Sequence, residues 1–158
     1  MLIGLIADTH GYLDPRIAVA FDGVGAIVHA GDVGGTEILD ALRAIAPVYA
    51  VRGNNDDKLG GLGLPLLADF ALAGLRFHLV HQLPHARPPA GTEVVVFGHS
   101  HRPLVEHRGD VLYVNPGAAG RVGFHRMQTV ALLEATRGHI AEARIVELGP
   151  REQRRKAG

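Results

Sequence analysis

The stretch Val94-Val95-Val96-Phe97-Gly98-His99-Ser100-His101 indicates the fold class of this chain. Its first four residues are large and apolar, which predicts a strand buried on both faces. Gly98 then allows the backbone to turn sharply as it leaves the sheet. The two histidines follow at the carboxyl end of the strand, where open α/β sheets bind their ligands. The stretch therefore predicts a metal site at one edge of a sheet.

Four other apolar segments end in the same way, each with a polar residue one to five positions further on. The segments are 2–7, 26–29, 48–51 and 77–80, and the polar residues after them are Asp8 and His10, Asp32, Asn54, and His81. Strands and helices alternate up to residue 51, which predicts right-handed crossovers and parallel strands. One such residue has an ordinary explanation in turn chemistry. Five strand ends with the same pattern predict one shared site.

Composition narrows the class of protein. With 158 residues, the chain predicts a single domain over 1–149 and a frayed basic tail over 150–158. Lys and Arg balance Asp and Glu at 16 each, so the net charge is zero and a bulk electrostatic attraction to nucleic acid or membrane is not expected. The absence of cysteine excludes thiolate metal ligands and cysteine nucleophiles. No signal sequence or membrane-spanning apolar segment is present, so we expect a cytoplasmic protein.

In their order along the chain, these motifs resemble those of the calcineurin-like metallophosphoesterase family. The matching elements are Asp8-Thr9-His10, Gly31-Asp32, Gly53-Asn54-Asn55-Asp56, His81 and Gly98-His99-Ser100-His101. The turn Asn115-Pro116-Gly117 is similar to that of the small bacterial and archaeal phosphodiesterase branch. The resemblance implies an α/β protein with a four-layer α/β/β/α sandwich. We expect antiparallel hairpins at 69–81 and 129–147, and parallel strands near the site.

The resemblance also implies a centre with two divalent metal ions. The ligands it implies are Asp8, His10 and His101 for one ion and Asn54, His81 and His99 for the other, with Asp32 bridging both. A ligand set of imidazole and carboxylate without sulfur suits Mn, which we expect, and also Ni, Fe, Co, Zn or Mg. A hydroxide bridging the two ions would attack phosphorus, and Asp32, Asn54 and His99 would be the catalytic residues of the centre.

The expected reaction is hydrolysis of a phosphodiester bond in a small or nucleotide-like substrate. Two alternatives stay open: a phosphomonoesterase or nucleotidase, and a catalytically weak metal-binding scaffold of the retromer-subunit type. The intact ligand set argues against the scaffold, because a scaffold has no need of all seven ligands. There is no strong case for nucleic acid or a membrane as partner, and a homo-oligomer is an open alternative.

One residue departs from the family pattern. Many relatives have His after the Asn of the third motif, whereas this chain has Asn55. An amide cannot transfer a proton, so general-acid help worth about 10²–10⁴-fold is in question, and diesters with good leaving groups should suffer least. We expect Asn55 and His125 to contact the substrate. For His125, in the loop 120–127, a substrate-facing lid and a solvated loop are both open.

Overall fold

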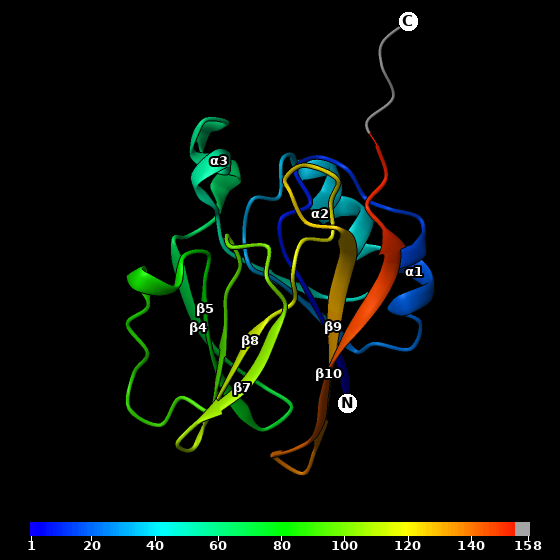
Figure 1. Cartoon of the computed structure of the whole chain (residues 1–158). Helices are drawn as coiled ribbons and strands as arrows, with labels where there is room; N and C mark the ends of the chain where they lie inside the picture. The colour runs from blue at the N-terminus through cyan, green and yellow to red at the C-terminus, as the bar shows by residue number, and fades with distance from the viewer. Residues whose placement is uncertain (154–158) are drawn as a thin grey trace, which may run out of the picture.

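Two five-stranded sheets, packed face to face, form the body of the protein in the computed structural model, which describes residues 1–153 (Figure 1). Sheet A has the order β10-β9-β1-β2-β3 and sheet B the order β4-β5-β6-β8-β7. The strands of sheet A are β1 (Leu2–Ile6), β2 (Ala26–His29), β3 (Val48–Ala50), β9 (Met127–Thr136) and β10 (His139–Pro150). Those of sheet B are β4 (Leu67–Leu72), β5 (Leu75–Val80), β6 (Val94–Val96), β7 (Leu104–Arg108) and β8 (Val111–Asn115).

Parallel strands lie in the middle of sheet B and in the β1-β2-β3 half of sheet A, and they lead to the site as the sequence predicted. Strand β1 pairs in parallel with β2, and β2 with β3, while β5, β6 and β8 form the parallel part of sheet B. The two predicted hairpins are β4–β5 and β9–β10, and both are antiparallel. The edge strand β7, which pairs with β8, was not predicted. The parallel strands place five chain segments at the same edge of the sandwich.

Apolar side chains fill two layers of core. Between the sheets, alternate residues of the strands interdigitate, with Leu5, Val28, Phe77, Val96 and Val114 all almost fully buried. The second layer lies between sheet A and the helices on its outer face. Each fully buried side chain of this kind contributes about 1.5–3 kcal/mol relative to an exposed one. These cores hold the sheets, and hence the strand ends, in fixed relative positions.

Helices α1 (Arg16–Ala20) and α2 (Thr36–Arg43) pack on sheet A, because each presents an apolar face to it (Figure 1). The short helix α3 (Asn54–Asp57) directly follows β3 and carries a residue of the site. The 3₁₀ turns are η1 (Gly60–Gly63) and η2 (Leu83–His85). The outer face of β5 is covered by the proline-rich segment 82–93, in which the Arg87 N–H donates to His78 Nε2 at 3.1 Å. The α/β sandwich is confirmed, and its layer beyond sheet B is mostly loop.

The start of the predicted tail over 150–158 contacts other parts of the chain. Strand β10 continues to Pro150, opposite Met127. Beyond it, the Glu152 N–H donates to Gln128 Oε1 at 2.8 Å, and the Tyr12 hydroxyl donates to Glu152 Oε2 at 2.6 Å. Residues 150 and 152 are therefore bonded to other parts of the described chain, and residues 154–158 lie outside the described residues. Among the described residues, no helix has the length and apolar character needed to cross a membrane.

Candidate metal centre

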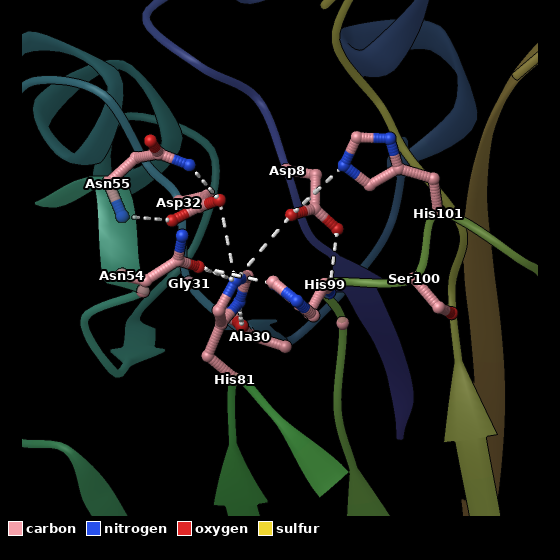
Figure 2. Close-up of polar contacts among 12 residues, drawn as sticks. Asp8, Ala30, Gly31, Asp32, Asn54, Asn55, His81, His99, Ser100 and His101 are labelled. Carbon is pink, nitrogen blue, oxygen red and sulfur yellow. Dashed lines mark hydrogen bonds and ion pairs between the residues drawn. The ribbon is translucent and has the colours of Figure 1, made fainter. Parts of the chain in front are cut away.

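All seven predicted metal ligands lie together at one edge of the sandwich, and Figure 2 shows how most of them point toward a common centre. They follow the ends of β1, β2, β3, β5 and β6. Contacts link them in a continuous chain. The distances are His101 Nε2 to Asp8 Oδ1 3.5 Å, Asp8 Oδ1 to His81 Nε2 3.9 Å, His10 Nε2 to Asp32 Oδ2 3.5 Å, Asp32 Oδ2 to His81 Nε2 3.3 Å, His81 Nε2 to Asn54 Oδ1 3.1 Å, and Asn54 Oδ1 to His99 Nδ1 3.2 Å.

Five of the seven residues have a left-handed backbone, which non-glycine residues adopt at a cost of about 1–3 kcal/mol each. They are Asp8 (φ 55°), His10 (φ 48°), Asp32 (φ 53°), His99 (φ 72°) and His101 (φ 61°). Backbone hydrogen bonds between loops maintain this conformation, such as Asp8 N–H to Gly31 O at 3.0 Å and His10 N–H to Asp32 O at 2.9 Å. Such strain concentrates at functional sites, where the surrounding structure holds it in place.

His81 is buried and oriented by the backbone. Its Nδ1 lies 2.7 Å from the carbonyl oxygen of Ala30, which can only accept, so Nδ1 carries the proton. Its Nε2 then faces the oxygens of Asn54 and Asp32. Burial lowers the pKa of His81, but the carboxylates of Asp32 and Asp8 outweigh burial and raise it. Gly31 permits this approach, since a Cβ there would lie 2.7 Å from His81 Nδ1.

Asp32 is ionised at neutral pH. Burial raises the pKa of its carboxyl, but the contact with His81 and two hydrogen bonds from Asn55 hold the pKa well below its usual range. The backbone N–H and side-chain amide of Asn55 donate to the two carboxylate oxygens at 2.9 Å and 2.8 Å. Asn55, expected to contact the substrate, therefore binds Asp32 with its amide nitrogen.

The residues fit a divalent ion. Asp8 Oδ1 and His10 Nε2 are buried, and neither has a hydrogen-bond partner within 1–153. Asp8, His10 and His101 can each offer one ligand atom within 4.8 Å of the others, and so can Asp8, Asp32 and His81. Buried polar atoms without partners cost about 1–3 kcal/mol each, which a bound cation would recover. Carboxylate, amide and imidazole donors also suit the first-row divalent metals expected from the sequence.

The two histidines of the opening motif serve different parts of the centre. His99 lies beside His81, with ring centroids 5.2 Å apart, and its Nδ1 faces Asn54. His101 lies beside His10, with ring centroids 5.9 Å apart, and its Nε2 faces Asp8. The two histidines thus lie beside different members of the predicted ligand set.

Two residues outside the ligand set, Asp56 and Asn115, support the loops of the centre. Asp56 accepts hydrogen bonds from the N–H groups of Val33, Gly34 and Gly53 at 2.9–3.0 Å, and so ties the loop after β2 to the loop after β3. In the sequence, the position of Asp56 within the motif Gly53-Asn54-Asn55-Asp56 could have indicated this role. The Asn115 amide donates to Ser100 Oγ at 3.0 Å and so supports the His99–His101 loop.

His29 is a fully buried supporting residue that lies behind the ligands. The Gly31 N–H donates to its Nδ1, and its Nε2 bonds the Thr9 hydroxyl. Burial lowers the pKa of His29 to about 4, so the ring is neutral.

His125 lies beside the centre, although it contacts no carboxylate there. Its ring centroid is 5.3 Å from that of His101, and its Nε2 lies 2.8 Å from the Gly120 carbonyl oxygen. A cavity of about 550 Å³ adjoins these rings, and its lining includes His99, His101, Phe124 and His125. The loop 120–127 thus faces the site, as the lid hypothesis requires.

Comparison with known proteins gives consistent matches. A family model described as a calcineurin-like phosphoesterase superfamily domain matches residues 1–138. A probable metallophosphoesterase of Methanocaldococcus jannaschii is 34% identical over 134 residues, covering 75% of this chain and 68% of that protein. A phosphodiesterase of the same organism is 30% identical over 139 residues, which cover 74% of this chain and 83% of that protein. Among solved structures, a Vps29 variant from Entamoeba histolytica has a TM-score of 0.74 at 19% identity. The match covers 93% of this chain and 99% of that one.

Proposed function

This chain belongs to the calcineurin-like phosphoesterase superfamily, and we propose that it is a phosphodiesterase with a two-metal centre. Family membership implies a hydrolase that uses divalent metal ions. The specific support for two ions is that the potential ligand atoms form two groups, Asp8 with His10 and His101, and Asp8 with Asp32 and His81. The phosphodiesterase relative favours a diester as substrate.

In the proposed centre, Asp8, His10 and His101 would hold one ion, Asn54, His81 and His99 would hold the other, and Asp32 would be shared by both. When bound, two divalent ions supply positive charge for the phosphate oxygens and lower the pKa of the attacking water. Manganese is the metal that we expect, with Ni, Fe, Co, Zn and Mg as alternatives to be compared. Asp8 and Asp32 neutralise only two of the four positive charges, so the site retains a net attraction for a phosphate anion.

The protein side chains orient this chemistry. Asn55 uses two hydrogen bonds to hold the Asp32 carboxylate in place, and Ala30 fixes the ring of His81. Since the Asn55 amide has no proton to transfer, the leaving group departs without general-acid help from this position. This favours diesters with leaving groups of low pKa over monoesters of alkyl alcohols. The expected substrate is a small or nucleotide-like phosphodiester.

The test is a metal-reconstitution assay. The protein is stripped with a chelator, supplied with Mn²⁺, Ni²⁺, Co²⁺, Zn²⁺ or Mg²⁺, and assayed with bis(p-nitrophenyl) phosphate and p-nitrophenyl phosphate. We expect two ions per chain by metal analysis and faster hydrolysis of the diester. Faster hydrolysis of the monoester would instead identify a phosphomonoesterase or nucleotidase.

A metal-binding scaffold is the second candidate function, because the chain shares its fold with Vps29 over almost its whole length. The same assay separates the two candidates. A scaffold predicts bound metal without turnover of either ester, whereas a phosphodiesterase predicts turnover that depends on the added ion.

A further inference from the structure

The loop 120–127 carries a phenylalanine whose side chain is entirely in solvent. Phe124 is 101% exposed. The surrounding backbone is nevertheless anchored, because the Arg151 guanidinium donates to the Gly123 carbonyl and the Arg151 N–H donates to Arg126 O at 2.8 Å. The Gly120 N–H also donates to Asp8 O at 3.1 Å. The ring is therefore presented to solvent from a fixed position beside the metal centre.

Gly123 allows this loop to lie directly on a predicted metal ligand. Its φ of 132° is outside the range that side-chain-bearing residues favour, and a Cβ there would come within 2.5 Å of His101 Nδ1. On the other side of Phe124, the ring of His125 packs edge-on against that of His101. Phe124 is thus connected on both sides to residues in contact with His101.

The cavity between the loop and the centre is larger than a phosphate group needs. Its volume of about 550 Å³ lies within the usual range of small-molecule sites, roughly 300–1,000 Å³. His99 and His101 line it where it meets the centre, and Phe124 and Arg102 line it further out. Arg102 is exposed and forms no ion pair with a described carboxylate. When phosphate occupies the centre, the rest of this cavity is available to the organic part of the substrate.

From this arrangement we infer that Phe124 is a specificity-determining residue that stacks on a planar aromatic ring of the substrate, while Arg102 attracts its negative charge. The inference rests on the proposed function, whose site it extends. A phenyl ring offers its face to any planar ring, and such stacking strengthens binding whatever the identity of the base. The ring is either a nucleobase or an aryl group, and both have the same stacking chemistry.

Equilibrium binding tests the inference without depending on turnover. Titration calorimetry on the Mn²⁺-loaded protein compares AMP with ribose 5-phosphate, which lacks the base. We expect AMP to bind about tenfold more tightly, as stacking of one base predicts. Phe124→Ala and Phe124→Leu should remove this preference, since neither keeps an aromatic face, and Phe124→Trp should keep it. Val122→Ala is the matched control, because Val122 is an exposed apolar residue of the same loop.

A second pair of ligands distinguishes the source of the ring. Phenyl phosphate and methyl phosphate differ only in the aromatic group, so a phenyl preference lost in Phe124→Ala indicates that any planar ring is accepted. A preference restricted to AMP indicates a nucleobase.

Equal binding of AMP and ribose 5-phosphate, no binding of either, or an unchanged preference in Phe124→Ala would overturn the inference. A base preference without diester hydrolysis would contradict the proposed function alone. Diester hydrolysis without any ring preference would contradict only the role of Phe124.

Discussion

The two sides of the candidate centre are built differently. On the His81 side, formed by Asn54, His81 and His99, the buried imidazole is oriented by the Ala30 carbonyl. On the Asp8 side, formed by Asp8, His10 and His101, two buried polar atoms lack a hydrogen-bond partner among the described residues. Asp32 lies between the sides and contacts both His10 and His81. The His81 side is thus ordered by the protein itself, whereas the Asp8 side needs a cation to satisfy its polar atoms.

The largest loss of activity is expected at Asp32, where the two sides meet. Asp32→Asn removes the charge proposed to bridge both ions, while its amide oxygen can still accept from the Asn55 N–H. We expect diesterase turnover at saturating Mn²⁺ to fall at least about a hundredfold, as for loss of one stabilising group in a transition state. Circular dichroism should show an unchanged fold. Turnover equal to that of the wild type would contradict the bridging role.

Metal binding should stabilise the folded protein mainly through the Asp8 side. At a Mn²⁺ concentration one hundred times the Kd, stability should rise by about 2.7 kcal/mol. Asp8→Asn should weaken binding at least tenfold, which reduces the gain at that concentration to about 1.4 kcal/mol. Urea denaturation with and without Mn²⁺ measures both values. The exposed Asp22 provides the control Asp22→Asn, and an equal loss in the two variants would refute the assignment.

In metal-free protein the His81 side should contribute more to stability than the Asp8 side. His81→Ala removes a buried ring and its hydrogen bond to Ala30, so the free energy of unfolding in chelator should fall by roughly 2 kcal/mol. His101→Ala removes a partly exposed ring, and the loss should stay below about 1 kcal/mol. Equal losses in the two variants would show that the sides are equally ordered without metal.

The smallest expected effect is a pH dependence of stability that arises from His29, which lies behind the His81 side. Burial lowers the pKa of His29 to about 4 in the folded state, against 6.5 in the unfolded chain. The unfolded chain therefore takes up a proton first, and the stability from neutral His29 is complete above pH 6.5 and lost as the pH falls toward 4. Between pH 7.5 and 5.5 the loss should be about 1.4 kcal/mol.

Denaturation of the chelated protein at several pH values measures this slope. His29→Asn should remove this loss of stability between about pH 7.5 and 5.5. His107→Asn, at an exposed position, should leave the pH dependence unchanged. A slope that is the same in His29→Asn and in the wild type would contradict the assigned pKa.

Much of the fold could be predicted because buried parallel strands have a plain signature. Val94–Val96 and Leu2–Ile6 are apolar runs, and each ends at the site as expected. Strand β7 has no such signature. Four of its five residues are exposed, and only its pairing with β8 makes Leu104–Arg108 a strand. The attachment of Glu152 was also missed, because its partners Tyr12 and Gln128 are distant in the chain.

The sequence by itself determined which side chains are candidates for the metal centre, because polar residues directly after buried parallel strands must meet at one edge. Only the tertiary structure decided how they are grouped. The His99 N–H donates to Asp8 Oδ2 across 91 positions of sequence, and His81 reaches the Ala30 carbonyl across 51. Such contacts depend on how the two sheets pack and on the left-handed backbone of the loops. These factors leave Asp8 Oδ1 without a hydrogen-bond partner within residues 1–153 and place Gly123, the neighbour of Phe124, against His101, neither of which follows from local sequence.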